Sequence, residues 1–458
     1  MSNQRTSALD YAKSNNPRFL SELKEFLTIP SISTDPDHQD DMVKAAYWVA
    51  NQFVALGLDK VEVFPTQGHP VVYGQMRSKN NNAPTILIYG HYDVQPAEPL
   101  DLWTTDAFEP VQRGENLFAR GASDMKGQVM ATIKALESVL NAGELPINIK
   151  FLIEGEEEIG SPNLAEFISN NLDLLECDIA LNPDTGMIAV DLPTITYALR
   201  GLAYFEVRID GPDHDLHSGI YGGVVHNPAQ ALCELIAGMH DDEGKVTLPG
   251  FYDKVRLIDD EEREELSRLP MGEAFYLQQT GAPALWGEEK YSPVERTGAR
   301  PTLEVNGIYS GFTGEGSKTV LPAWAMAKIS TRLVPDQDPE EVNQQMVQYL
   351  ESNSPDTVSF KVTNLVGSPA SISDQRSVGV KAMQDAMEQV WGKKPLFKRE
   401  GGSVPVVVLF MDLLKVDSVN CGFSLPDDNA HSPNEKLHLP TWTNGIDTII
   451  NFIYNLAG

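Results

Sequence analysis

The sequence predicts an α/β fold in which a mixed β-sheet is flanked by helices, with a second, α+β domain inserted into the first. Strand-like segments rich in β-branched and aromatic residues alternate with helical segments up to about residue 193. From residue 194 long alternating strands take over, and the α/β pattern returns after residue 371. We therefore expect a catalytic-type domain formed by residues 1–193 and 372–458, and an inserted domain formed by residues 194–371.

The first domain opens with two amphipathic helices separated by a Pro/Ser-marked break at residues 29–33. The segments that follow are bounded by turn residues and have either strand composition or helical periodicity. In chain order they are strands at 60–64, 71–76 and 85–94, a helix at 127–140, a strand at 147–157, a helix near 163–174 and a strand at 177–184.

The inserted domain begins with a half-exposed strand pair from Thr194 and continues with a helix at 227–239. Residues 241–316 are interpreted as a helix plus loops, and a later strand and a helix opening at Asp338 complete a strand-helix-strand-strand-helix-strand order. After residue 371 the sequence predicts a helix to Trp391, a buried strand at 404–411 and a final helix at 439–456.

Composition excludes disorder and a membrane span. Hydrophobic residues make up 41% of the 458 residues, and 35 glycines bring the apolar share close to that of globular proteins. The longest apolar runs are far shorter than the ~20 residues of a transmembrane helix. The polar N-terminal stretch has no apolar signal segment. We therefore expect a cytoplasmic protein with no membrane partner.

The charge balance is strongly acidic, with 35 Lys and Arg against 65 Asp and Glu and a net charge of −30. Such a chain repels phosphate backbones, so we expect no nucleic-acid partner. A solvated acidic surface accounts for the charge without any cationic ligand. The three cysteines, Cys177, Cys233 and Cys421, form no C-x-x-C pair, which fits reduced thiols and excludes a disulfide scaffold.

The first candidate for chemistry is the pair His91 and Asp93, which follows the apolar strand beginning at Thr85. Strand ends are where α/β folds place their ligands. Residues two apart on an extended chain face the same side, so Asp93 can accept a hydrogen bond from the imidazole and hold it toward a metal. Alone the pair is weak evidence, because strand-end histidines also occur as ordinary surface or core residues.

Further candidates lie in turns and after strands. Asp124 sits in a Gly/Ser-rich turn before a helix, where it could equally serve as an N-cap. Several carboxylates gather at Glu154–Glu158, and charges this close need either cations or solvent to stay ionised; a solvated loop is the alternative. Asp184 and His431 both follow strands.

Together these residues form a nitrogen and oxygen ligand set that suits zinc or manganese. Two divalent ions would be balanced in charge by three ligating carboxylates and a bridging hydroxide, and a surplus glutamate could act as general base. The sequence thus predicts a metal site whose parts are weak separately and strong jointly. Chemistry alone does not say which of three adjacent glutamates is the base.

Seven motifs occur in a fixed order: H-x-D, S-D-M-K-G, E-G-x-E-E-x-G-S, a lone Asp, D-L-H-S-G-x-Y-G-G, E-G-G-S and H-S-x-N-E. In order and spacing the chain resembles the dinuclear-metal metallopeptidase family of aminoacylases, carboxypeptidases and dipeptidases, from about Leu20 to Leu456. The motifs DLHSGIYGG and REGGSVP resemble its cytosolic carnosine-type, non-specific dipeptidases most. The resemblance implies a zinc-peptidase-like catalytic domain and an inserted ferredoxin-like lid and dimerisation domain.

The resemblance also implies a role for each candidate. His91 and Asp184 would hold one metal ion, Glu158 and His431 the other, and Asp124 would bridge both. Asp93 would orient His91, Glu157 would be the general base, and Glu156 falls on a variable position of the motif. The ions would be Zn²⁺, with Mn²⁺ as the alternative. A cis peptide bond is implied between Asp124 and Met125.

The resemblance implies that the inserted domain supplies substrate contacts. His217 would stabilise the oxyanion in the partner subunit's site, so the enzyme would be a homodimer; an ordinary surface histidine is the alternative. The expected substrate-binding residues are Arg332, Thr319, Glu400, Gly402 and Ser403. A structural salt bridge is the alternative for Arg332. A plain turn between helix and strand is the alternative for the glycine loop, which comprises residues 400–403. Carnosine-cleaving relatives carry a further histidine near residues 365–368, which this chain lacks, and a preference for β-alanyl-histidine is therefore not expected.

The function that these expectations describe is metal-dependent hydrolysis of dipeptides. Water held between the two ions would lose its proton to Glu157 and attack the scissile carbonyl, and Glu157 would return the proton to the leaving amine. Two alternatives remain open: an N-acyl amino acid deacylase or carboxypeptidase that uses the same site, and a catalytically silent scaffold that binds metal or peptide.

Overall fold

The computed structural model describes residues 2–402 and 404–458. The chain divides into two compact units: unit 1 comprises Met1–Tyr197, Ser373–Phe397 and Pro405–Gly458, and unit 2 comprises Ala198–Ile372 and Lys398–Val404. Residues 194–197 lie in unit 1 because they belong to a strand of its sheet, and residues 398–404 lie in unit 2, where the sequence had suggested the first domain.

Unit 1 is built on a mixed sheet with the strand order β1-β2-β6-β3-β7-β17-β8-β15, and β16 also pairs with β8. Strands β6, β3, β7 and β17 run parallel, whereas β1, β2, β8 and β15 pair with their neighbours antiparallel. The bounds are β1 Lys60–Phe64, β2 Val71–Met76, β3 Thr85–His91, β6 Asn148–Glu154, β7 Ile179–Asn182, β8 Thr194–Leu199, β15 Ser371–Ile372, β16 Leu396–Glu400 and β17 Ser418–Cys421.

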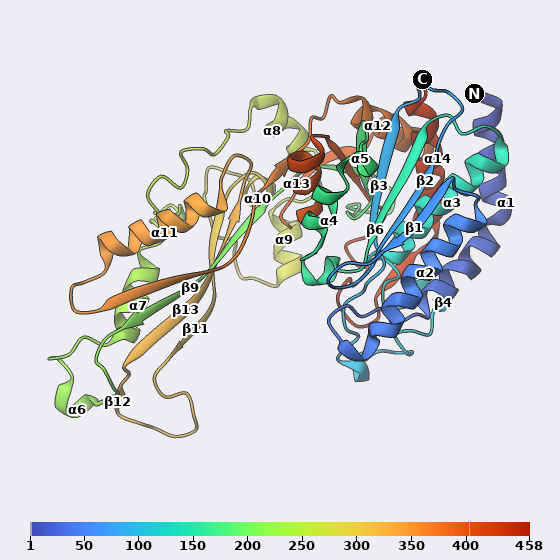
Figure 1. The fold of residues 1–458 in the computed structure, drawn as a ribbon. Coiled ribbons are helices and arrows are strands. Elements are labelled where there is room, and N and C mark those ends of the chain that lie inside the picture. Colours follow the sequence, from blue (N-terminus) through green and yellow to red (C-terminus); the bar gives the residue numbers. More distant parts are fainter. Residues whose placement is uncertain (1, 403) are drawn as a thin grey trace. The chain divides into compact units, whose positions relative to one another are not determined.

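Helices cover both faces of this sheet (Figure 1). The long helices α1, α3, α12 and α14 pack on one another, and α3 is buried on all sides from Lys126 to Val139. The bounds are α1 Ser2–Leu27, α2 Gln39–Ala55, α3 Lys126–Ala142, α4 Leu164–Asn170, α5 Leu172–Leu175, α12 Val378–Trp391, α13 Pro405–Leu409 and α14 Leu439–Leu456. Apolar side chains pack between these helices and the central strands to form the core.

One predicted strand is wrong. Residues 404–411 are helical: α13 spans Pro405–Leu409, and a turn of π-helix follows at Phe410–Leu414. Short apolar runs fit a buried strand or a buried helix equally well, so periodicity does not separate the two. Pro405 favours the helix, because its fixed φ suits the first helical turn and its missing N–H is not needed there.

A small three-stranded sheet in unit 1 has the order β18-β5-β4. Strand β5 (Asn116–Phe118) pairs with β4 (Val111–Arg113) and with β18 (Lys436–His438), which lies over 300 residues later in the chain. This pairing brings the turn after β5 beside the loop before β18, and both segments contribute to the site described below.

Unit 2 contains an antiparallel sheet with the order β11-β13-β9-β14. Helices α7 and α11 pack on one face, where alternate residues of β9 and β13 are buried. This order of two strand-helix-strand units is the ferredoxin-like arrangement. The bounds are β9 Gly201–Asp210, β10 Leu216–His217, α6 Ser218–Tyr221, α7 Pro228–Ala237, α8 Asp260–Ser267, α9 Glu273–Thr280, α10 Pro293–Gly298, β11 Thr302–Ser310, β12 Val320–Leu321, β13 Trp324–Leu333, α11 Pro339–Asn353 and β14 Ser359–Ser368.

Strand β11 falls inside the segment 241–316 that the sequence analysis interpreted as a helix plus loops. Most of its residues are half-buried or exposed, so it lacks the strict alternation that marks β9 and β13. A weakly alternating edge strand is difficult to recognise from sequence.

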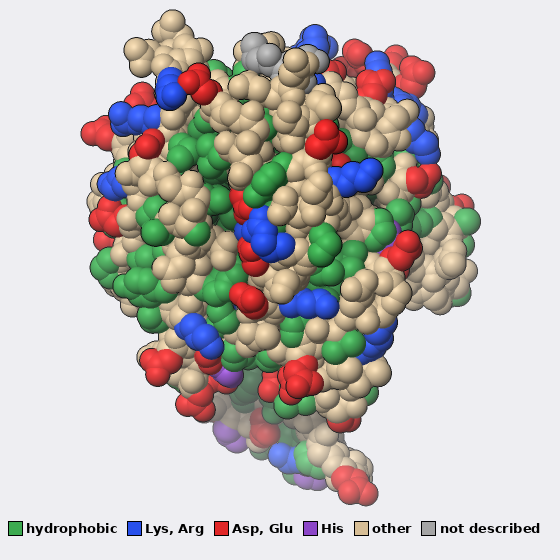
Figure 2. All heavy atoms as spheres, turned by 90° about the vertical axis from the view of Figure 1, so that its right-hand side faces the viewer, with side chains coloured by type: hydrophobic (Ala, Val, Ile, Leu, Met, Phe, Trp, Pro, Cys, Tyr) green, Lys and Arg blue, Asp and Glu red, His purple; other side chains and the backbone are tan. Residues whose placement is uncertain are grey.

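The one face drawn in Figure 2 mixes acidic and basic side chains. On the face that carries α1 and α2, the two signs are interspersed and no single acidic patch forms, despite the net charge of −30 (Figure 2). Among the described residues, no helix is both long enough and apolar enough to cross a bilayer.

Candidate metal centre

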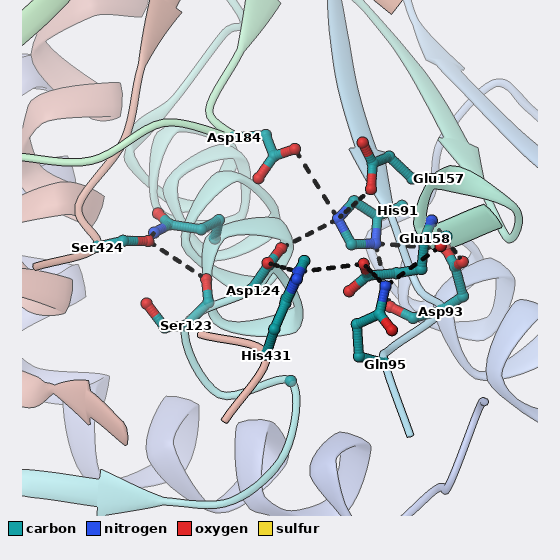
Figure 3. Close-up of polar contacts among 12 residues, drawn as sticks. His91, Asp93, Gln95, Ser123, Asp124, Glu157, Glu158, Asp184, Ser424 and His431 are labelled. Atoms are coloured by element: carbon teal, nitrogen blue, oxygen red, sulfur yellow. Dashed lines mark hydrogen bonds and ion pairs between the residues drawn. The ribbon is translucent and has the colours of Figure 1, made fainter. Parts of the chain in front are cut away.

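The candidate centre lies at the carboxyl ends of three neighbouring parallel strands of unit 1. His91 is the last residue of β3, Glu157 and Glu158 follow β6, and Asp184 follows β7. Because β6, β3 and β7 are adjacent and parallel, these strand ends meet at one edge of the sheet, where α/β folds place their ligands. The side chains point into a shared space (Figure 3).

Two further residues reach this space from the small sheet. Asp124 lies in the turn between β5 and α3, and His431 lies in the loop before β18, where its backbone φ is 62°. The expected cis peptide bond between Asp124 and Met125 is present.

Asp124 faces both histidines with different oxygens. His91 Nε2 lies 3.3 Å from Asp124 Oδ1, and His431 Nε2 lies 2.9 Å from Asp124 Oδ2. His431 Nε2 is also 3.2 Å from Glu158 Oε2, and His91 Nε2 is 3.9 Å from a carboxylate oxygen of both Glu157 and Asp184. Two groups of residues that share His91 have ligand atoms close enough together to hold an ion: His91, Asp124 and Glu158, or His91, Glu157 and Asp184.

Asp93 fixes the orientation of His91. His91 Nδ1 lies 3.0 Å from the Asp93 backbone carbonyl and 3.3 Å from its Oδ1. The other carboxylate oxygen, Oδ2, accepts a hydrogen bond of 3.1 Å from the Glu158 backbone N–H. With Nδ1 donating to Asp93, Nε2 carries the lone pair and faces the other carboxylates, which is the arrangement a metal-ligating histidine requires.

The three adjacent glutamates separate in the structure. Glu156 points away from the centre: its Oε1 accepts hydrogen bonds from the His69 backbone N–H and the Asn163 side chain, both at 3.0 Å. Glu157 and Glu158 face the centre. The Glu156 side chain therefore links the turn after β6 to the segment around His69 and does not take part in the centre.

The carboxylates of the centre lie so close together that they shift one another's pKa values. Burial, reinforced by neighbouring carboxylates and opposed by His91, raises the pKa of Glu157 to about 8. Burial and the Asp124 carboxylate raise the pKa of Asp184 well above its usual range. Hydrogen bonds to Asp124 and Glu158 raise the pKa of His431 to about 10. Several buried carboxylates this close cannot all ionise unless cations compensate them.

The residues present fit a divalent cation. His91 Nε2 is buried and makes no hydrogen bond to any described residue, although it points at three carboxylates. An imidazole nitrogen with no hydrogen bond, surrounded by carboxylate oxygens, is the donor set that zinc and manganese accept.

Comparisons with known proteins agree with this geometry. The model of peptidase family M20/M25/M40 matches residues 87–455. The chain belongs to this family. It is 32% identical to the Cys-Gly metallodipeptidase DUG1 of Candida albicans, over 96% of this chain and 94% of that one. It is 30% identical to the human Beta-Ala-His dipeptidase, over 98% of this chain and 92% of that one.

Solved structures of the family have the same fold. The metallo-carboxypeptidase Sso-CP2 of Sulfolobus solfataricus matches 96% of this chain and 99% of its own, with a TM-score of 0.84 and 34% identity. The Saccharomyces cerevisiae di-peptidase Dug1p matches 100% and 99%, with a TM-score of 0.81 and 28% identity. The predicted metallopeptidase family, α/β fold class and hydrolase class are thereby confirmed, and M20 metallopeptidases use divalent metal ions.

The remaining expected site residues of this M20 chain belong to unit 2. His217 is exposed at the end of β10, where its Nδ1 accepts a hydrogen bond of 3.0 Å from the Gly219 backbone N–H. The Thr319 backbone carbonyl accepts a hydrogen bond of 3.1 Å from the Ser218 N–H, so Thr319 lies beside His217. Arg332 lies on β13, opposite Leu202 of β9.

The expected glycine-loop residues lie at the end of β16 and after it. Glu400 is the last residue of β16, and its backbone carbonyl accepts a hydrogen bond of 3.2 Å from the Arg200 N–H. Arg200 Nε donates to the Gly401 carbonyl at 3.2 Å, next to the exposed Gly402. Ser403 lies outside the described residues.

Sequence reasoning missed two residues that contact this M20 site. Gln95 Nε2 donates a hydrogen bond of 2.8 Å to Glu158 Oε2, and Glu435 accepts hydrogen bonds from the backbone around Asp124. Gln95 gave no signal of its own, because a glutamine four residues after a histidine has no characteristic spacing. Glu435 is the last residue of the H-S-x-N-E motif, and its place in that motif is the sequence feature that could have indicated a role in the site.

Proposed function

We propose that this chain hydrolyses the peptide bond of dipeptides with two divalent ions, of which zinc is the first choice and manganese the alternative. His91 and Asp184 would hold one ion and Glu158 and His431 the other, with Asp124 between them. The observation that carries the proposal is the placement of Asp124, which presents one carboxylate oxygen to each histidine at 3.3 and 2.9 Å.

When bound, the two ions would polarise the scissile carbonyl and make a water molecule acidic enough to attack it. Glu157 then takes the proton of the attacking water and returns it to the leaving amine. Its carboxylate faces the centre, with an oxygen 3.9 Å from His91 Nε2. The hydrogen bonds to the His69 backbone and the Asn163 side chain are made by the neighbouring Glu156, so Glu157 is available for proton transfer. Asp93 keeps His91 in the tautomer that presents Nε2.

We assign substrate recognition to unit 2. Arg332 is suited to the C-terminal carboxylate of a dipeptide, because a guanidinium pairs with a carboxylate through two hydrogen bonds. His217 is suited to stabilising the oxyanion of the tetrahedral intermediate. Thr319 lies beside His217 and would contact the same substrate. Glu400, Gly402 and Ser403 are the further residues that we assign to substrate binding.

We propose a homodimer in which His217 serves the partner subunit's site. His217 is exposed, and the short segment after it exposes the apolar side chains Ile220, Tyr221 and Val224, with Val224 82% accessible. Exposed apolar side chains gathered in one short segment are typical of an interaction surface.

We also propose a cytoplasmic location, which fits the three free cysteines.

The experiment that tests the function combines metal analysis with a dipeptide panel. The purified chain should contain two divalent ions, and chelation should abolish dipeptide cleavage, which added Zn²⁺ or Mn²⁺ should restore. A chain that retains full cleavage after complete removal of metal would contradict the proposal. A panel that includes Cys-Gly and β-alanyl-histidine would define the side-chain preference.

A carboxypeptidase is the second candidate, because the metallo-carboxypeptidase Sso-CP2 is 34% identical to this chain and has a TM-score of 0.84. Both activities use the same centre and a free C-terminal carboxylate. Rates on a dipeptide and on its N-blocked or N-extended counterpart separate them. Faster release of the C-terminal residue from the blocked or extended substrate would favour the carboxypeptidase or deacylase.

A further inference from the structure

A fully buried carboxylate, that of Glu435, binds the turn that carries Asp124. Glu435 is 0% exposed, and its two carboxylate oxygens accept four hydrogen bonds. Oε1 accepts from the backbone N–H groups of Ser123 at 2.9 Å and Asp124 at 3.1 Å. Oε2 accepts from the Gly121 N–H at 2.9 Å and from Arg120 Nη1 at 2.8 Å.

The bonded N–H groups belong to the turn that carries Asp124. This turn joins β5 to α3, so its amides have no partners in a strand or a helix. One carboxylate that binds three amides of four consecutive residues fixes the path of the backbone there. Gly121 has φ 80°, and a Cβ at this position would lie 2.6 Å from Val94 Cγ1, so a residue with a side chain does not fit there without a shift of Val94.

The same carboxylate joins the two loops that hold the facing ligands. Glu435 follows His431 by four residues and immediately precedes β18, and its carbonyl accepts a hydrogen bond of 3.1 Å from the Ala119 N–H at the end of β5. A second buried carboxylate supports this junction: Asp428 Oδ2 accepts 2.8 Å from Ser123 Oγ and 2.7 Å from the Leu425 N–H.

Arg120 extends the network to a third loop. Its Nη2 donates to the Pro96 carbonyl at 3.0 Å, and Pro96 follows Gln95, which binds Glu158. Arg120 and Glu435 are each 1% exposed at the side chain and neutralise one another. A buried ion pair of this kind is weak evidence for stability as such, because desolvation offsets the attraction. The pair contacts the backbone of the loops that carry the candidate ligands, and it can therefore hold those loops in place.

We propose that Glu435 is a positioning residue that sets Asp124 and His431 for metal binding, an inference that rests on the proposed dinuclear centre. Partners of metal ligands typically change metal affinity or activity by about 10- to 100-fold when removed. Glu435→Gln keeps the shape of the side chain but replaces an acceptor with an NH₂ group that faces N–H donors. Loss of those hydrogen bonds releases the turn that holds Asp124.

The test measures metal affinity and fold stability separately on the full chain, with Mn²⁺ alone as the probe. After chelation, calorimetric titration should give two sites for the wild type and about 10- to 100-fold weaker binding for Glu435→Gln. The matched control is Glu288→Gln in unit 2, whose partner Arg300 is bound at 2.8 and 2.9 Å with similarly low exposure. Its melting temperature should fall in chelator while its Mn²⁺ affinity stays unchanged.

Glu435→Asp is the second variant, because it keeps the charge beside Arg120 but shortens the reach to the turn, and it should weaken Mn²⁺ binding in the same direction. With the dipeptide, both Glu435 variants should lower kcat and leave KM within about twofold. Mn²⁺ affinities of either folded variant within twofold of wild type would overturn the inference and leave the proposed function intact. A wild type that binds neither Mn²⁺ nor Zn²⁺ would overturn the proposed function and this inference with it.

Discussion

The glutamates at the end of strand β6 and directly after it show at the residue scale how identical side chains take different roles. Glu154 is fully buried and accepts hydrogen bonds from the Tyr89 hydroxyl at 2.7 Å and the Ser161 hydroxyl at 2.9 Å. Burial raises the pKa of Glu154 to about 8. Glu156 binds His69 and Asn163, whereas Glu157 and Glu158 face the candidate centre. Position in the turn, and not residue type, assigns these roles.

Glu157→Gln tests the proposed base. The amide cannot take a proton, so we expect kcat to fall by about 10³-fold. Metal content should stay at the wild-type level. Glu156→Gln is the matched control, because the neighbouring residue points away from the centre and should retain kcat within about threefold. Equal losses in both variants, measured by steady-state kinetics on a dipeptide, would contradict the assignment of Glu157.

Gln95→Leu tests the contact that sequence reasoning missed. The substitution removes the 2.8 Å hydrogen bond to Glu158 Oε2, an oxygen that also lies 3.2 Å from His431 Nε2. Without this donor Glu158 is less well held, and we expect about tenfold weaker metal binding. Titration of the chelated protein with Mn²⁺ measures it. Unchanged affinity would show that Glu158 keeps its orientation without Gln95.

At the element scale, helices are defined by their ends and by the face they bury. Helix α11 begins where Asp338 accepts hydrogen bonds from the backbone N–H groups of Glu340 at 2.7 Å and Glu341 at 3.3 Å. Pro339 follows at the first helical position. This start was predictable because capping depends on neighbouring residues alone. The helical character of residues 404–411 was not, because it depends on what the apolar run packs against.

Asp338→Ala tests the cap of α11. We expect a loss of about 1 kcal/mol, because two amides of the first turn lose their acceptor. For a unit of this size that corresponds to a fall in melting temperature of about 2–4 °C. Hydrogen exchange should also speed up at Glu340 and Glu341. Glu340→Gln in the same turn removes a charge without touching the cap and should have a smaller effect.

Asp447 makes the packing of α14 pH-dependent. Burial raises the pKa of Asp447 to about 6 from 3.8, and Lys13 of α1 only partly opposes this. The folded state therefore holds a proton that the unfolded chain releases between pH 4 and 6. Stability from this group is lost as the pH rises through that window and then stays constant. A shift of this size corresponds to about 3 kcal/mol at most.

Asp447→Asn should therefore be more stable than the wild type above pH 6 and equal to it near pH 4. Melting temperatures at pH 4, 5, 6 and 8 measure the difference. Asp385→Asn is a matched control, because it removes the same charge from the neighbouring helix α12 at a residue that is exposed to solvent. A constant difference between wild type and Asp447→Asn at all four pH values would contradict the proposed cause.

At the scale of the whole molecule, the proposed dimer predicts that two inactive variants recover activity when they are mixed. If His217 serves the partner subunit's site, Glu157→Gln and His217→Ala chains are each inactive alone. Heterodimers of the two regain one working site of two. After the subunits are mixed in equal amounts and exchanged, about a quarter of wild-type activity should appear. No recovery, with exchange verified by mass spectrometry, would place the action of His217 within its own chain.

The sequence by itself determined which segments form most of the strands and long helices and which residue types follow the parallel strands. These features depend on local periodicity, turn residues and motif order, and the resemblance that the motifs carry named His91, Asp124, Glu158, Asp184 and His431 as the expected ligands. The prediction failed where local pattern is ambiguous, as in residues 404–411 and the edge strand β11.

Only the tertiary structure decided how those residues meet. The pairing of β5 with β18 brings Asp124 and His431 together across some 300 residues of chain, and no local pattern encodes that contact. The same pairing buries Glu435 against the turn of Asp124, and the β6 turn directs Glu156 away from the centre. Hydrogen bonds between segments distant in sequence set these orientations, because a buried carboxylate is stable only where the fold supplies its donors.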